Sequence, residues 1–166
     1  MRCLVYDRWS LIRHRRGTFF VAQGEWDAKA GKDAYENWQG ICGPFCNDDT
    51  NERGLRFLEF AKFNDLVLAN TSGHHKASRR WTWHSPNGQH HNQIDYILVR
   101  KSFRSGMNIT RTQSFPGAGI RSDHTLLMMT FHLRQKKESA SQNTQDSSLI
   151  SKSWKIPMCW KPSRIW

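Results

Sequence analysis

The stretch from Asn92 to Val99 limits what this chain can fold into more than any other part of the sequence. It reads Asn-Gln-Ile-Asp-Tyr-Ile-Leu-Val, and its density of β-branched and aromatic residues predicts a buried strand. A carboxylate in the middle of such a strand, here Asp95, is costly to bury unless it has a partner. The strand therefore requires a second polar group from elsewhere in the chain.

A candidate partner is the sequence Ser-Asp-His at residues 122–124, which precedes another strand-like run at residues 125–131. An Asp and a His that meet at the ends of neighbouring strands can hold a catalytic imidazole in one tautomer. We therefore expect Asp95 and His124 to lie within hydrogen-bond reach. The alternative is structural: a core Asp that caps a turn, and an Asp-His pair on the surface.

Two further carboxylates follow a short apolar run at residues 18–22, which predicts a central strand. Gly24 permits a tight turn after this strand, and Glu25 and Asp27 come next. Side chains at positions i and i+2 of an extended chain point to the same side. The pair is therefore a candidate site for a divalent cation or a polarised water.

The elements in between predict an α/β fold. A polar, glycine-containing loop pinned by Trp38 and Phe45 precedes a helix that begins after Thr50 or Asn51 as its cap. A strand at residues 66–70 follows, so strand, helix and strand form a βαβ-like unit. The apolar face expected for the helix consists of Leu55, Phe57, Leu58, Phe60, Ala61 and Phe63.

A hairpin is predicted between residues 81–84 and 90–99, with its turn at Pro86, Asn87 and Gly88. Trp81 or Trp83 is a candidate to stack on a nucleobase, as aromatic side chains do in proteins that bind single strands. Burial between sheet layers is the alternative for either tryptophan.

The charge of the chain favours a polyanionic partner. The net charge is +11 over 166 residues, and no apolar run is long enough to span a membrane, so we expect DNA or another nucleic acid and no membrane. A merely soluble basic protein is the alternative. Residues 17–65 carry five Lys/Arg and nine Asp/Glu, net −4, whereas residues 66–134 carry nine and two, net +7. Metal ligands on one side and phosphate contacts on the other would fit this asymmetry.

Basic residues flank the predicted hairpin. The candidates for nucleic-acid binding are Lys76, Arg79, Arg80, Arg100, Lys101 and Arg104. Because paired strands of a hairpin run in opposite directions, we expect Arg79 and Arg80 to lie near Arg100 and Lys101.

Three motifs resemble, in order, the last three motifs of the endonuclease/exonuclease/phosphatase superfamily: residues 23–28, Ile94-Asp95-Tyr96-Ile97, and Ser122-Asp123-His124. The run from Trp38 to Leu133 resembles the endonucleases of LINE-type retrotransposons and the related craniofacial development protein 2-like host proteins. The resemblance implies a partial two-sheet α/β sandwich over residues 17–134, with the N-terminal half of the family's domain missing.

The resemblance also implies roles. A Mg²⁺- or Mn²⁺-dependent hydrolysis of phosphodiesters is expected, in which His124 contacts the scissile phosphate or acts as general base and Asp95 orients it. Asp123 would belong to the metal and phosphate shell. Glu25, as a further metal ligand, and Asp27 would position water and stabilise charge.

The chain departs from the family pattern Gly-Asp-x-Asn at both polar positions, with Glu25 for the Asp and Asp27 for the Asn. The family's earlier metal-binding motif has no counterpart before Gly17. We therefore expect weak or no endonuclease activity from this chain. A non-catalytic nucleic-acid-binding remnant and an unstable fragment of a degenerate element are the alternatives.

The ends of the chain lie outside the resemblance. Residues 1–16 are unmatched, and residues 135–166 are expected to be a disordered basic tail because residues 135–152 offer almost nothing apolar to bury. Four scattered cysteines do not form a disulfide scaffold, although Cys42 and Cys46 have a spacing that could begin a zinc site. Without an apolar signal segment, the expected location is the nucleus or cytoplasm rather than the outside of the cell.

Overall fold

The fold is taken from a computed structural model. It describes residues 2–6, 9–13, 20–47, 49–115, 122–135 and 150–156.

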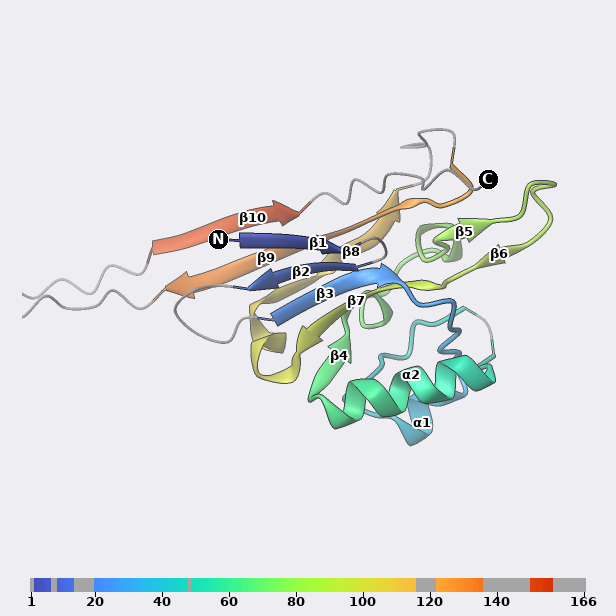
Figure 1. The fold of residues 1–166 in the computed structure, drawn as a ribbon, viewed down its shortest axis with the longest axis horizontal. Helices are drawn as coiled ribbons and strands as arrows, with labels where there is room; N and C mark the ends of the chain where they lie inside the picture. The colour runs from blue at the N-terminus through green and yellow to red at the C-terminus, as the bar shows by residue number, and fades with distance from the viewer. Residues whose placement is uncertain are drawn as a thin grey trace, which may run out of the picture.

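Five strands form the largest sheet, in the order β1-β2-β3-β7-β4, and each neighbouring pair is antiparallel (Figure 1). The strands are β1 (Arg2–Tyr6), β2 (Trp9–Arg13), β3 (Phe20–Glu25), β4 (Leu66–Leu68) and β7 (Asp95–Arg100). The predicted strand around Asp95 is therefore confirmed, and it lies between β3 and β4.

The remaining strands form two smaller antiparallel sheets. One has three strands: β8 (Met107–Phe115), β9 (Leu126–Gln135) and β10 (Ile150–Ile156). The other is a hairpin of β5 (Trp83–His84) and β6 (His91–Asn92).

Helices connect these strands. The α-helices are α1 (Ala34–Asn37) and α2 (Glu52–Phe63), and the 3-10 helices are η1 (Ala69–Thr71), η2 (Ala77–Arg79) and η3 (Lys101–Gly106). β3 and β4 each pair antiparallel with β7, so they run parallel to one another, with α2 in the connection between them. This arrangement confirms the predicted α/β class and its strand, helix, strand unit.

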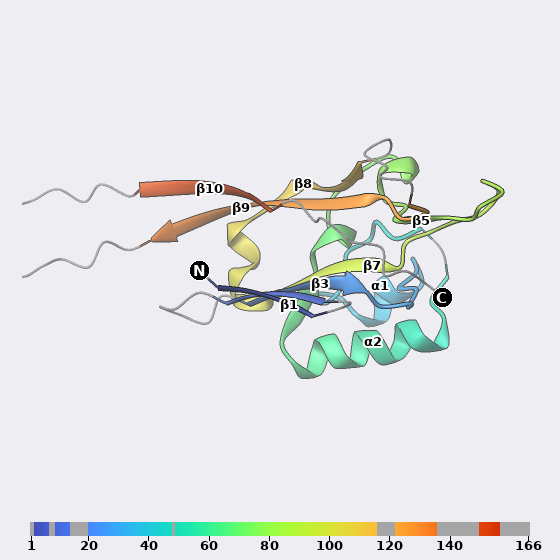
Figure 2. The ribbon, with the colours of Figure 1, turned by 45° about the horizontal axis from the view of Figure 1, so that its top comes forward.

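The described fold has three layers, with the five-stranded sheet between α2 and the three-stranded sheet (Figure 2). Alternate residues of β7 face the two sides, as the period of a strand requires. Tyr96 and Leu98 join the core beneath α2, whereas Ile97 and Val99 pack towards Leu127 of β9 and its neighbours. β7 therefore contributes to both hydrophobic cores.

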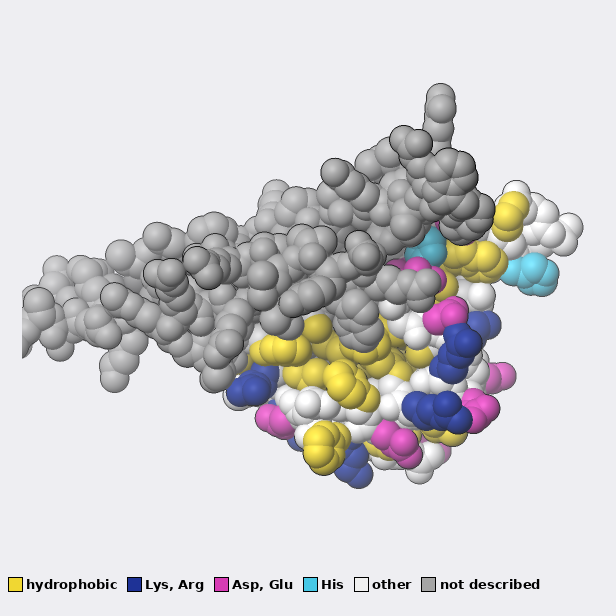
Figure 3. Space-filling model, viewed as in Figure 1, with side chains coloured by type: hydrophobic (Ala, Val, Ile, Leu, Met, Phe, Trp, Pro, Cys, Tyr) yellow, Lys and Arg dark blue, Asp and Glu magenta, His cyan; other side chains and the backbone are white. Residues whose placement is uncertain are grey.

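Helix α2 begins as predicted. The side chain of Asn51 caps it by accepting a hydrogen bond from the backbone amide of Gly54 at 2.7 Å. Its apolar face is narrower than predicted, because Leu55, Phe60 and Phe63 are exposed. Figure 3 shows hydrophobic side chains, in yellow, gathered on the described surface alongside α2.

The predicted hairpin forms, but it is short. Trp83 pairs with Asn92 and His84 with His91, and after Asn92 the chain leaves the hairpin to enter the five-stranded sheet as β7. The expected placement of Arg79 and Arg80 beside Arg100 and Lys101 is therefore wrong, since the hairpin pairing does not extend along β7.

Two predicted end segments contain strands. β1 and β2 of the unmatched N-terminal segment extend the sheet beyond β3, and β10 pairs with β9 inside the segment expected to be a disordered tail. Residues 136–149 and 157–166 of that expected tail lie outside the described residues.

No helix among the residues that the structure describes has the length and apolar character needed to cross a membrane.

Candidate functional site

Glu25 and Asp95 are brought together by strand pairing. Glu25 ends β3 and lies directly across from Asp95, the first residue of β7. Directly opposed residues of an antiparallel pair have their Cβ atoms about 5 Å apart. Two carboxylates from distant parts of the sequence therefore share one end of the sheet.

Two buried polar side chains fix the backbone around Asp95. The hydroxyl of Thr82 accepts hydrogen bonds from the backbone amides of Ile94 and Asp95, both at 3.0 Å. The amide group of Asn70 donates to the carbonyl of Asp95 at 3.1 Å and accepts from the amide of Ile97 at 3.1 Å. Buried backbone groups need such partners, so Thr82 and Asn70 complete the start of β7.

His124 is placed by a short strand-like contact with the β5 region. Trp83 and His124 form an isolated antiparallel bridge. The amide of His84 donates to the carbonyl of Asp123, and the amide of Thr125 donates to the carbonyl of Thr82, both at 2.8 Å. Thr82 therefore touches both sides of the site, since its hydroxyl holds β7 and its carbonyl holds the segment with His124.

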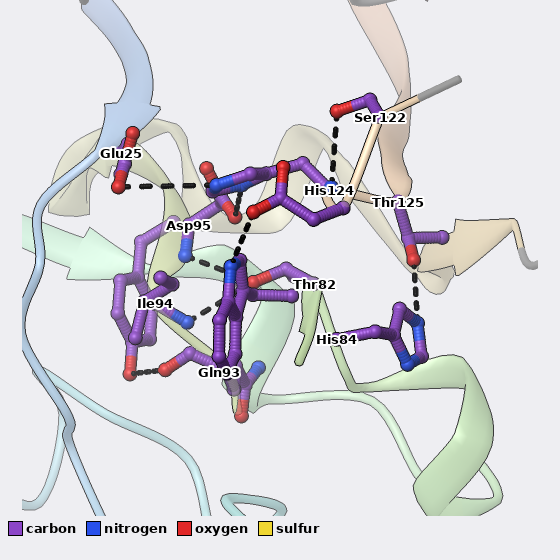
Figure 4. A network of polar contacts seen from close by, with 12 residues as sticks. Glu25, Thr82, His84, Gln93, Ile94, Asp95, Ser122, His124 and Thr125 are labelled. Carbon is purple, nitrogen blue, oxygen red and sulfur yellow. Dashed lines mark hydrogen bonds and ion pairs between the residues drawn. The ribbon is translucent and has the colours of Figure 1, made fainter. Parts of the chain in front are cut away.

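Asp95 and His124 are hydrogen-bonded, which confirms the predicted contact. The Nδ1 atom of His124 lies 2.9 Å from Oδ2 of Asp95, and its Nε2 atom lies 3.9 Å from Oε1 of Glu25 (Figure 4). The hydroxyl of Ser122 accepts from the backbone amide of His124 at 3.0 Å. A carboxylate at Nδ1 places the ring proton on that nitrogen and leaves Nε2 directed towards Glu25.

The surroundings favour the charged form of this imidazole. Burial alone would lower the pKa of His124, but the hydrogen bond to Asp95 and the negative charges of Asp95, Glu25 and Asp123 outweigh it and raise the pKa above the ordinary value. The site thus places this imidazole among carboxylates at one end of the central sheet, and their charges favour its protonated form.

The structure separates Asp27 from this pairing. β3 ends at Glu25, and Asp27 has a positive φ of 53°, so the extended geometry expected for residues 25–27 does not occur. The exposed side chain of Asp27 forms an ion pair with Arg53 of α2. Asp123 is also exposed, and its Oδ2 atom accepts a hydrogen bond from Nε1 of Trp83 at 2.8 Å.

The basic candidates fall into two groups. Lys76, Arg79 and Arg80 belong to the η2 segment, which leads within a few residues into Thr82 and the site. Arg79 bonds to Gln113 at 3.1 Å, and Arg80 bonds to the carbonyl of Cys46 at 3.2 Å.

The second group consists of Arg100, Lys101 and Arg104 and lies at the other end of β7. Arg100 ends the strand that Asp95 begins, and Lys101 and Arg104 follow in η3. Five residues of strand separate Arg100 from Asp95 by about 16 Å. The η2 group is therefore the one that adjoins the site.

The described residues do not fit a complete site for Mg²⁺ or Mn²⁺. Within the described part of the chain, no group of three or more His, Cys, Asp or Glu side chains is arranged to hold a metal ion. One oxygen of Asp95 is bonded to His124, and one of Asp123 to Trp83. Hard divalent cations take about six oxygen ligands, of which a protein usually supplies several.

Cys42 and Cys46, whose spacing suggested a zinc site, are buried free thiols. Burial raises the pKa of the Cys42 thiol to about 11 and that of Cys46 to about 12. Such thiols stay protonated near neutral pH, and thiolates are the form that binds zinc.

Sequence reasoning missed Thr82 and Asn70. The sequence predicted Thr82 as part of one strand and Asn70 as the end of another, but it did not predict the hydrogen bonds that their side chains make to β7. A polar residue inside an apolar run was the available signal, because a buried polar group must find a hydrogen-bond partner.

The chain is similar to craniofacial development protein 2 of Bos taurus and of Tragulus javanicus. Each is 41% identical to it over 113 residues, which is 68% of this chain, and this confirms that part of the resemblance. The chain spans only 18% and 19% of the lengths of these relatives. No protein-family model matches the chain, and no solved structure matches it.

Proposed function

We propose that this chain carries part of a phosphodiesterase-type domain, similar to the endonucleases of LINE-type retrotransposons within the endonuclease/exonuclease/phosphatase superfamily. Its proposed role is to bind nucleic acid, with weak or no hydrolysis by this chain alone. The observation that carries the proposal is the hydrogen bond of 2.9 Å between Asp95 and His124. The two residues lie 29 positions apart and belong to two of the three motifs that resemble this superfamily.

In this function, His124 contacts a phosphate oxygen through Nε2. A raised pKa favours the protonated ring, and an imidazolium donates a charge-assisted hydrogen bond to an anionic oxygen. The same shift makes the ring a poorer general base near neutral pH. Phosphate contact is therefore favoured over the general-base role that the resemblance left open.

The proposal includes no step at a divalent cation, because the side chains that the structure describes do not make a complete cation site. In an enzyme of this type Mg²⁺ or Mn²⁺ would neutralise the charge of the phosphate. Without that ion, Glu25, Asp95 and Asp123 surround the imidazole with negative charge. Affinity for DNA must then come from cations next to the site.

The cations of the η2 group suit this role. Lys76 and Arg79 are exposed, and Arg80 is half-buried in the same segment. Phosphate contacts require positive charge held on a surface and tolerate imprecise geometry. We therefore propose sequence-tolerant binding of DNA or another nucleic acid, in the nucleus or cytoplasm.

The test compares two double charge reversals of equal size. Lys76→Glu with Arg79→Glu changes the η2 group, and Lys101→Glu with Arg104→Glu changes the group at the far end of β7. All four residues are exposed, so neither variant removes a buried side chain. DNA affinity is measured by fluorescence anisotropy across a series of salt concentrations.

The η2 variant should lose at least about tenfold in affinity, and its log-log salt slope should fall by about two, since each phosphate contact contributes about 0.9. The far-end variant should keep most of the affinity. A greater loss in the far-end variant, or binding that does not depend on salt, would rule out this binding surface.

A further inference from the structure

A second cluster of ring side chains, formed by Trp81, His84 and His91, lies at the β5–β6 hairpin. This hairpin projects from the rest of the described fold (Figure 1). His84 and His91 are directly paired across the two strands. Their Nδ1 atoms lie only 2.7 Å apart. Neither residue takes part in the Asp95–His124 contact.

The two rings are held by their neighbours. Trp81 stacks on His91, with ring centroids 4.2 Å apart and an angle of 20° between the planes. The Nε2 atom of His84 lies 2.8 Å from the hydroxyl of Thr125 (Figure 4). The backbone of Thr125 is fixed in turn by its hydrogen bond to Thr82.

The pair faces away from the site of Asp95 and His124. Consecutive residues of a strand point to opposite faces. Trp83 is bonded to Asp123 on one face, so the side chain of His84, the next residue, belongs to the other face. The His84–His91 pair is therefore a separate feature of the hairpin.

Two Nδ1 atoms at this distance share one proton. One ring must donate and the other must accept, because two protonated nitrogens would repel each other. The two imidazoles thus face each other through their Nδ1 atoms, and imidazole nitrogen is a ligand that late transition-metal ions prefer.

We propose that His84 and His91 form a binding site for a divalent late transition-metal ion, of which Ni²⁺ and Cu²⁺ fit best. The ion takes the place of the shared proton, which leaves Nδ1 for the solvent, and the ring that carried it takes up a proton from the solvent on Nε2, so both ligands stay neutral. With metal–nitrogen bonds of about 2.05 Å, two nitrogens at 90° around a metal lie about 2.9 Å apart, and in a tetrahedron about 3.3 Å apart. The separation in the fold is closer to the first value, and a square or tetragonal nitrogen and oxygen site favours Cu²⁺ or Ni²⁺.

The residues around His84 and His91 support metal binding by this pair. With Nδ1 bound to the metal, the Nε2–H group of His84 donates to the hydroxyl of Thr125. A ligand histidine usually makes such a hydrogen bond through its other nitrogen, which fixes the orientation of the ring. Water completes the coordination, since the rings are only half-buried.

The test is a Ni²⁺ titration of the full chain, followed by calorimetry and by the imidazole resonances in NMR spectra. The wild-type chain should bind one Ni²⁺ at the hairpin, and the resonances of His84, His91 and the Trp81 ring should broaden before those of His74. Replacing either ligand, His84→Gln or His91→Gln, should weaken binding at least about tenfold, because even partners outside the ligand shell are worth that much. Mg²⁺ in place of Ni²⁺ should leave these resonances unchanged.

The matched control is His90→Gln, which removes an exposed histidine next to His91 in the same hairpin. It should bind Ni²⁺ as the wild type does. Circular dichroism confirms that each variant is folded, and the wild-type NMR titration stands even if one variant is not. Equal affinities for the His90 and His91 variants, or earlier broadening at His74 and His90 than at His84 and His91, would overturn the proposal.

Discussion

Thr82 joins two segments that must meet for the site to exist. Its hydroxyl accepts two consecutive backbone amides of the Asp95 strand, and its carbonyl accepts the amide of Thr125. The residue is completely buried. Thr82 therefore supports the start of the Asp95 strand through its hydroxyl and the segment of His124 through its carbonyl.

Replacing this hydroxyl by a methyl group should destabilise the fold. Thr82→Val keeps the shape of the side chain but leaves the amides of Ile94 and Asp95 without their acceptor. An unsatisfied buried group costs about 1–3 kcal/mol, so the free energy of unfolding measured in urea should fall by at least that amount. Ser78→Ala, which removes an exposed hydroxyl, should change it by less than about 0.5 kcal/mol. Equal effects of the two changes would contradict the role given to Thr82.

The protonation of His124 gives a second prediction at this scale. NMR titration should show His124 with a pKa above the ordinary value and His84 with a pKa below it. A group whose pKa is raised by folding adds stability that is fully present below its unfolded pKa and is lost as the pH rises through the folded pKa. The contribution of His124 to the unfolding free energy should therefore decline from about pH 6.5 upwards.

Asp95→Asn isolates the cause of this decline. The variant removes the hydrogen-bonding carboxylate, so burial dominates, the pKa of His124 falls and the loss of stability above pH 6.5 disappears. The opposite shift of His84 should remain and serves as an internal control. An unchanged pKa of His124 in the variant would show that Asp95 does not control it.

At the scale of elements, α2 meets the preceding loop at a glycine. A Cβ atom added to Gly54 would lie 1.8 Å from the carbonyl oxygen of Lys29, and Asn51 bonds to the backbone amides of both residues. The first turn of the helix therefore lies directly against the chain that leaves the site strand β3.

Two effects oppose each other in Gly54→Ala. Alanine in place of glycine favours a helix by about 0.5–1 kcal/mol, but the backbone oxygen of Lys29 cannot give way as a side chain can. Overpacking of this kind costs about 1–3 kcal/mol. We expect a net loss of stability in urea unfolding, whereas Glu59→Ala on the exposed face of α2 should be nearly neutral. A stabilised Gly54→Ala variant would mean that the loop is free to move away.

Some of these elements could be predicted from local sequence patterns, and others could not. The buried strand around Asp95 and the cap at Asn51 were predictable because each depends on a local pattern or one short-range hydrogen bond. The positive φ of Asp27 and its ion pair with Arg53 were not, since both depend on where α2 lies relative to the end of β3. The hairpin itself was predictable from its turn residues, but the move of β7 into another sheet was not.

At the scale of the whole molecule, the position of β7 explains the main error about charge. The sequence places Arg79 and Arg100 on either side of one predicted hairpin. In the fold β7 is inserted between β3 and β4, so its two ends have different surroundings: the Asp95 end lies at the candidate site and the Arg100 end adjoins η3. Strand order in a sheet is set by contacts far apart in sequence, which the local pattern of one chain does not encode.

Nucleic-acid binding and phosphodiester hydrolysis make different demands on this fold. The proposed binding uses the cations of η2, and these lie on the described surface. Hydrolysis needs a group that neutralises the phosphate in the transition state, and the described side chains do not assemble a complete cation site for it. The loss of one such electrostatic group typically lowers the rate by about 10²–10³.

The last prediction is therefore that this chain nicks plasmid DNA weakly or not at all when Mg²⁺ or Mn²⁺ is supplied, although it binds the same plasmid. Conversion of supercoiled to relaxed plasmid, followed by gel electrophoresis, measures the rate, and His124→Ala shows whether any activity belongs to the site. A trace of nicking that persists in His124→Ala is contamination. Fast nicking that EDTA abolishes and His124→Ala removes would mean that Glu25, Asp123 and water hold the ion well enough without a third protein ligand. In that case the longer carboxylate at position 25 would be compatible with catalysis, and the chain would be an active nuclease.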